Sequence, residues 1–151
     1  LSSGFIDQAM ASELIHVPHQ YIENVQKEYE LRRDVLFSGL QNIPGVTVCK
    51  PEGAFYVIVG LPVDDSEKFC QWLLTDFRDP SASSLRKDSG QAGQAETLML
   101  APAAGFYATE GKGKNEVRIA YVLNTKDLKA AMEVLAQGLE AFARRHKRML
   151  A

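Results

Sequence analysis

Two long amphipathic segments, one near each end of the chain, limit most strongly the folds that this sequence can adopt. From His19 to about Gln41, and again from Asn124 onward, apolar residues recur every three or four positions between charged ones. This spacing predicts two long helices, each of which buries an apolar stripe along one side. The first helix should end at Pro44-Gly45, because proline disfavours helix in the residue before it and glycine supplies a turn.

Short β-prone runs lie between these helices. The β-branched and aromatic content predicts strands over 46–49, 54–59, 97–101 and 117–122. A third helix is expected to begin at Asp64, Asp65 or Ser66 and to end before Pro80, and a short helix within residues 1–16 could be capped by Ser2 or Ser3. The order is helix, two strands, helix, two strands, helix. It predicts an α/β two-layer sandwich, in which helices cover mainly one face of a small mixed or antiparallel sheet.

Composition sets the outer limits of function. The 151 residues, 46% hydrophobic and 24% charged, are typical of one globular domain, or of one domain with an appendage. A net charge of -2 gives little support for nucleic-acid binding, and no apolar run reaches the roughly 18 residues of a membrane span. Cys49 and Cys70 lack metal or redox spacing and are expected to be buried thiols in a reducing compartment, the cytoplasm.

The segment 78–96 is expected to be a flexible loop. It is rich in serine, glycine, glutamine and charged residues and poor in apolar ones. Such a composition cannot bury enough surface to offset the entropy of ordering the chain.

Arg118 is the most informative candidate for a functional residue. It interrupts a strand that otherwise contains valine, isoleucine, alanine and tyrosine. A buried guanidinium needs an anionic partner, and its planar fork suits a carboxylate or a phosphate. Simple alternation is the competing explanation: it would place Val117, Ile119 and Tyr121 on one face and Arg118 on the other, in solvent. Periodicity alone favours the second explanation.

Other patterns that suggest chemistry fail on spacing. Five residues, not four, separate Gly105 from Gly111-Lys112, so the loop is not a phosphate-binding motif. Asp64-Asp65 is more typical of a helix start than of a catalytic pair. No metal site is expected, and no nucleophile elbow is present. The basic segment 143–148 suits the C-terminal end of a helix, because cations there interact favourably with the helix dipole. The residues considered for these roles are His16, His19 and His146 and the serines Ser81, Ser83, Ser84 and Ser89.

Three stretches together resemble the C-terminal small domain of the class I/II, fold-type I aminotransferases, near the aspartate aminotransferase branch. They are the helix with Tyr29, Arg32 and Arg33 leading to Pro44-Gly45, the segment 51–56 (PEGAFY), and the segment 101–106 (APAAGF) followed by 116–121 (EVRIAY). The closing helix fits the same pattern. The resemblance covers nearly the whole chain from about residue 20, in the family's order.

The resemblance implies a role for Arg118. In this family the arginine of the strand before the final helix binds the α-carboxylate of the amino-acid substrate, and Arg118 stands at that position. It also implies a pyridoxal 5'-phosphate (PLP)-dependent transfer of an amino group between an L-amino acid, with aspartate as one candidate, and a 2-oxo acid. Family members are usually homodimers.

The family's Schiff-base lysine and cofactor-binding residues belong to the large domain and have no match here. The resemblance thus implies that residues 1–18 end the large domain, that 19–151 form the small domain, and that no catalytic or cofactor-binding residue lies in this chain. The chain lacks an initial methionine and is expected to be a fragment that is inactive alone. Two alternatives stay open: a stand-alone carboxylate-binding or regulatory module, and a fold-type I PLP lyase.

Overall fold

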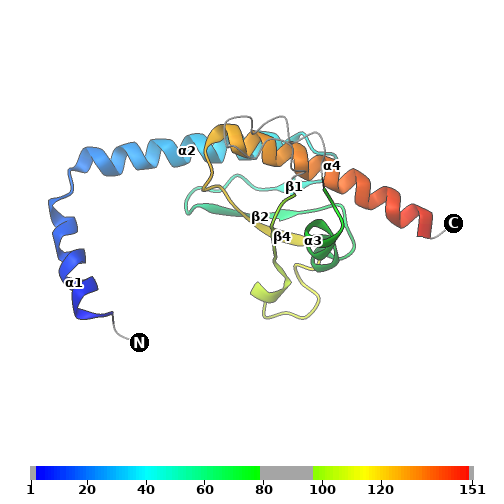
Figure 1. The fold of residues 1–151 in the computed structure, drawn as a ribbon, viewed down its shortest axis with the longest axis horizontal. Coiled ribbons are helices and arrows are strands. Elements are labelled where there is room, and N and C mark those ends of the chain that lie inside the picture. The colour runs from blue at the N-terminus through cyan, green and yellow to red at the C-terminus, as the bar shows by residue number, and fades with distance from the viewer. Residues whose placement is uncertain (1–2, 79–96, 150–151) are drawn as a thin grey trace.

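The structure is a computed structural model that describes residues 3–78 and 97–149, with no side chains beyond Arg145. In this part of the chain, helices lie at both ends and the strands lie between them (Figure 1). The elements are α1 (Phe5–Ser12), a 3-10 helix (Glu13–His16), α2 (His19–Gln41), β1 (Thr47–Val48), β2 (Tyr56–Gly60), α3 (Ser66–Thr75), β3 (Ala101–Pro102), a 3-10 helix (Ala104–Phe106), β4 (Glu116–Ala120) and α4 (Thr125–Met149). The predicted flexible loop 78–96 lies, except for Arg78, outside the described residues.

The four strands form one antiparallel sheet in the order β1-β2-β4-β3. Strand β4 is therefore an interior strand. Its central residue, Arg118, pairs with Ile58 of β2 on one side and with Ala101 of β3 on the other. The predicted small α/β sandwich is confirmed, and its sheet is antiparallel throughout the described residues.

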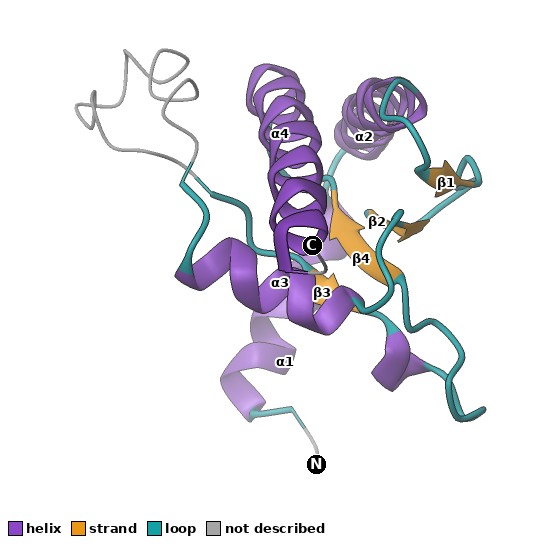
Figure 2. Ribbon diagram, turned by 90° about the vertical axis from the view of Figure 1, so that its right-hand side faces the viewer, coloured by secondary structure: helices purple, strands orange, loops and turns teal. Residues whose placement is uncertain are grey.

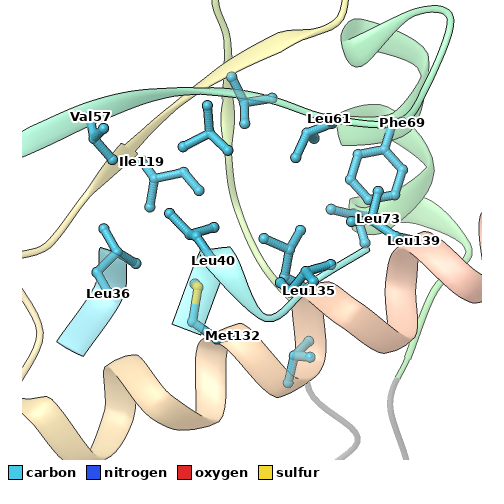
Figure 3. Close-up of a cluster of buried hydrophobic side chains, with 14 of the residues drawn as sticks. Leu36, Leu40, Val57, Leu61, Phe69, Leu73, Ile119, Met132, Leu135 and Leu139 are labelled. Atoms are coloured by element: carbon cyan, nitrogen blue, oxygen red, sulfur yellow. The ribbon is translucent and has the colours of Figure 1, made fainter. Parts of the chain in front are cut away.

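Helices α2 and α4 run side by side along one face of the sheet (Figure 2). Helix α3 joins this layer through the ring of Phe69, which lies 5.2 Å from that of Phe142 in α4. The core lies between the layers, and all three helices and the two longer strands supply its side chains (Figure 3). Its fully buried members include Leu40, Val59 and Leu135. Burial of this continuous apolar layer is the main force that holds the helices on the sheet.

The helix boundaries mostly follow the predicted signals. The Asp65 carboxylate accepts hydrogen bonds from two backbone N–H groups at the start of α3, and Asn124 does the same for one at the start of α4. Gly45 adopts a left-handed φ of 79° after α2, as the turn requires. The short helix predicted within residues 1–16 is present as α1, but the suggested serine cap was wrong, because Gly4 holds the N-cap position and no side-chain hydrogen bond caps the helix.

The predicted third strand is shorter than expected. Only Ala101 and Pro102 pair with β4, whereas residues 97–100 are not in a strand. Leu98 and Leu100 pack against the core while Met99 is 84% exposed, so the segment alternates as a strand does but pairs with no strand among the described residues. β-propensity describes a side chain's fit to a sheet surface and does not provide the partner strand.

Helix α1 extends away from the rest of the molecule (Figure 1). None of its residues is buried, and its apolar side chains Phe5, Ile6 and Met10 are each more than two-thirds exposed. Among the described residues, no helix is long and apolar enough to cross a membrane.

Candidate functional site: the exposed face of strand β4

The alternation of β4 decides where Arg118 points. Val117 and Ile119 are buried at 0% and 6% exposure on the helix-covered face, whereas Arg118 and Ala120 are exposed. The guanidinium therefore stands on the sheet face opposite the core. Hydrogen-bonded strands flank it on both sides, so its backbone is held more firmly than a loop would hold it.

Two aromatic rings flank the Arg118 guanidinium. Its Cζ lies 5.4 Å from the ring centroid of Tyr56 and 5.0 Å from that of Phe106. Both distances are within the range of a cation–π interaction. Within residues 3–78 and 97–145, no carboxylate forms an ion pair with Arg118 and no side chain or carbonyl accepts a hydrogen bond from it. Among the described residues, nothing therefore competes with an external anion for these donors.

Phe106 owes its position to the turn that follows β3. The backbone N–H of Ala103 donates to the Glu116 carbonyl at 2.9 Å, and that of Phe106 donates to the Ala103 carbonyl at 2.9 Å. Ala103 itself is completely buried. These contacts fix a single 3-10 turn beside β4, and Phe106 is its last residue.

The glycine-rich loop that follows has a structural role. Gly111 and Gly113 adopt φ values of 78° and 71°, and a Cβ atom on Gly113 would collide with the Tyr107 ring. The Tyr107 hydroxyl donates to the Glu116 carboxylate at 2.5 Å, which raises the pKa of Tyr107, and Lys112 lies 5.2 Å from the Tyr107 ring. The loop thus folds back on β4, as expected of a connection rather than a phosphate-binding motif.

Helix α2 secures the end of β4. The Arg32 guanidinium donates from Nη1 to the Val122 carbonyl at 2.6 Å and from Nε to the Glu28 carboxylate at 2.7 Å. The buried hydroxyl of Tyr121 donates to the carbonyls of Gly53 and Ala54, at 3.2 and 2.9 Å. The strand that carries Arg118 is therefore attached to α2 and to the turn before β2.

Arg33, the second arginine of α2, has a different partner. Its Nε lies 2.9 Å from the Asp34 carboxylate, which also pairs with Lys50. Hydrogen bonds from these two cations lower the pKa of Asp34. This network is on the surface and contributes little to stability.

The other candidate groups do not form a second site in the described part of the chain. No cluster of three histidine, cysteine or carboxylate side chains that could hold a metal is present there. His16 Nε2 lies 3.8 Å from the Glu13 carboxylate in the first 3-10 helix, and His19 Nδ1 lies 3.1 Å from the Glu23 carboxylate in α2. Both pairs are exposed. In the basic segment, Arg144 and Arg145 pair with Glu140 and Asp76. The side chain of His146 and the four serines of 81–89 lie outside the described residues.

The lysines that the structure describes are all exposed. They are Lys27, Lys50, Lys68, Lys112, Lys114, Lys126 and Lys129. A lysine that forms a Schiff base with a carbonyl compound usually needs a desolvated or otherwise electropositive pocket, which lowers its pKa. The described residues therefore include a candidate anion-binding group, Arg118, and no lysine in such a pocket.

The family model described as aminotransferase class I and II matches residues 2–135. This chain belongs to the class I and II aminotransferase family. The fold and the order of motifs agree with that assignment, so the resemblance noted in the sequence is confirmed.

Named relatives and solved structures agree with this family assignment. An aspartate aminotransferase of Pyrococcus horikoshii is 31% identical over 121 residues, which are 79% of this chain and 25% of that protein. An aspartate aminotransferase of Musicola paradisiaca is 34% identical over 103 residues, which are 66% of this chain and 24% of that protein. The crystal structure of an aromatic aminotransferase from Pyrococcus horikoshii OT3 superposes with a TM-score of 0.58 at 25% identity, over 82% of this chain and 28% of that one. The chain thus spans about a quarter of the length of the curated relatives it matches.

The aromatic neighbours of Arg118 were not predicted as part of a site. Tyr56 was assigned to a strand and Phe106 to a loop, and both also end segments that carry the family resemblance, 51–56 and 101–106, without a role being given to either ring. The residues lie 62 and 12 positions from Arg118 along the chain. A large apolar residue in a polar, glycine-rich loop was a further signal for Phe106, and it became meaningful once the β2-β4-β3 order was known.

Proposed function

We propose that this chain is the substrate-carboxylate-binding small domain of a PLP-dependent aminotransferase, which transfers an amino group between an L-amino acid and a 2-oxo acid. The observation that carries the proposal is the exposed Arg118 on an interior strand, with rings beside it and no carboxylate partner among the described residues. Two relatives named aspartate aminotransferase make aspartate the first substrate to test.

Arg118 would bind the substrate's α-carboxylate through two parallel N–H···O bonds. Such a bidentate pair fixes the carboxylate in position and in plane, which a point charge cannot do. A fixed carboxylate also limits the rotation of the adjoining Cα–H bond, so less orientational entropy is lost on reaching the transition state. The cofactor supplies the electron sink for the reaction.

The cofactor and its lysine are proposed to lie in another domain of the same polypeptide. The exposure of all described lysines supports this division, as does the fraction of the relatives that the chain spans. Residues 1–18 are proposed to belong to that large domain and 19–151 to the small one, because α1 buries no residue against the remainder. The chain alone is then expected to be inactive, and the complete enzyme to be a cytoplasmic homodimer.

The test is Arg118→Lys in the cofactor-loaded enzyme that contains this chain. Lysine keeps the charge and loses the fork, so KM for aspartate and its 2-oxo acid should rise at least about tenfold, as expected when hydrogen bonds to a charged group are lost. Arg145→Lys, at an exposed ion pair on α4, is the matched control and should leave KM unchanged. An Arg118→Lys enzyme with unaltered KM and kcat would refute the assignment.

A further inference from the structure

The rings of Tyr56 and Phe106 lie outside the hydrophobic core. They are 40% and 58% exposed, so core burial does not account for their positions. Tyr56 comes from β2, on one side of β4, and Phe106 follows β3, on the other side. Each lies about 5 Å from the Arg118 guanidinium carbon.

The rings restrict the directions from which a ligand can approach Arg118. A guanidinium is planar, and its five N–H donors lie in that plane. The two rings come from opposite sides of β4, and Arg118 is exposed on the sheet face opposite the core. We therefore expect an anion to approach from the direction away from the sheet. With a ring on each side, the edge of the fork is the part of the guanidinium that we expect it to contact.

We propose that Tyr56 and Phe106 are positioning residues, which hold the Arg118 guanidinium for edge-on contact with a planar carboxylate and thereby select carboxylates over tetrahedral oxyanions. This inference rests on the proposed role of Arg118. A carboxylate presents two oxygens in one plane, matching the fork between the rings. A phosphonate or sulfonate presents a third oxygen out of that plane, toward a ring whose face is electron-rich.

The test compares ring-removing with ring-preserving variants of the cofactor-loaded enzyme. Phe106→Leu and Tyr56→Leu keep an apolar side chain but remove the ring, whereas Phe106→Trp and Tyr56→Phe keep an aromatic ring. Each leucine variant should raise KM for the amino acid by about two- to fivefold, the value of one exposed cation–π contact, with kcat little changed. The aromatic variants should stay close to the wild-type KM.

Selectivity is the second readout. Inhibition constants are measured for a matched pair of substrate analogues, one with the α-carboxylate and one with a phosphonate in its place. The ratio of the two constants should favour the carboxylate in the wild-type enzyme and should fall in both leucine variants. In an Arg118→Gln background, Phe106→Leu should have no further effect, because the cation is gone.

Each outcome has a defined meaning. If Arg118→Lys leaves carboxylate binding unchanged, the proposed function fails, and this inference fails with it. If Arg118→Lys weakens binding but the leucine variants match the wild type, only the inference fails. It also fails if the aromatic variants are as impaired as the leucine variants, or if the carboxylate–phosphonate ratio does not move. Melting temperatures within about 2 °C of the wild type confirm that these exposed positions leave the fold intact.

Discussion

Gly39 of α2 lies so close to Met132 of α4 that a Cβ atom at residue 39 would be 2.7 Å from the Met132 Cγ and 3.2 Å from its Cβ. Both are inner atoms of the methionine side chain, so rotation of its end does not relieve the contact. The close approach of the two covering helices therefore depends on a residue without a side chain.

Gly39→Ala should destabilise the protein by about 1–3 kcal/mol, the usual cost of overpacking, although alanine favours a helix over glycine by about 1 kcal/mol. Urea denaturation followed by circular dichroism measures the change. Ser38→Ala, one position away and exposed, is the control and should be neutral or slightly stabilising. A Gly39→Ala protein as stable as wild type would mean that the helices separate at little cost.

The two aspartates before α3 should differ in their effect on stability. The Asp65 side chain accepts from the N–H groups of Glu67 and Lys68, both at 3.1 Å, whereas Asp64 is exposed and does not cap the helix. Asp65→Ala should cost about 1 kcal/mol of unfolding free energy, as is typical when an N-cap is lost. Asp64→Ala should cost less than half of that. Equal losses in the urea midpoint would contradict the capping assignment.

The two thiols should react at very different rates. The expectation of two buried thiols is wrong for Cys49, which is exposed. Cys70 is buried, and burial, together with the nearby Glu67, raises the pKa of its thiol to about 11. Because the thiolate is the reactive form, Cys70 should resist an aromatic disulfide reagent at pH 8 until the protein unfolds. The folded chain should rapidly release one equivalent of the reagent's aromatic thiolate, and a second equivalent should appear only in denaturant. Cys49→Ser should abolish the rapid phase, and rapid release of two equivalents would be inconsistent with the core packing.

Tyr107 should titrate above the usual range for a phenol. Its hydrogen bond to the Glu116 carboxylate, followed by desolvation, raises its pKa above the ordinary value of 10.0. A folded-state pKa above the unfolded value contributes stability that is complete below about pH 10 and is lost as pH rises through the raised pKa. Tyr107→Phe should therefore remove a high-pH step from the phenolate absorbance curve. Tyr21→Phe, at a 59% exposed position, should leave that step in place.

Features that depend on local sequence could be predicted. The periodicity of α2 predicted both of its ends. The caps of α3 and α4 are among the few candidate side chains that the sequence offered for each helix start. The alternation of 117–121 correctly separated Val117, Ile119 and Tyr121, which are buried, from Arg118, which is exposed. These outcomes follow from backbone geometry, which acts over a few residues.

Features that depend on a distant partner could not be predicted. The strand expected over 97–101 shrank to Ala101–Pro102, since only those residues meet β4. The rings of Tyr56 and Phe106 come together at Arg118 only through the sheet order. The sequence identified the charged group of the candidate site, but its surroundings come from segments far apart in the chain.

The pairing of Ile58 with Arg118 has a consequence for how variation in the core affects binding. Side chains alternate along a strand, so a slip of β4 by one residue would carry the guanidinium into the apolar layer and expose Val117 and Ile119. Such a chain could not close its core, and every molecule that folds must therefore present Arg118 outward. Substitutions in the core should accordingly reduce the amount of folded protein in a cell, while each molecule that does fold still presents Arg118 on the open face of the sheet.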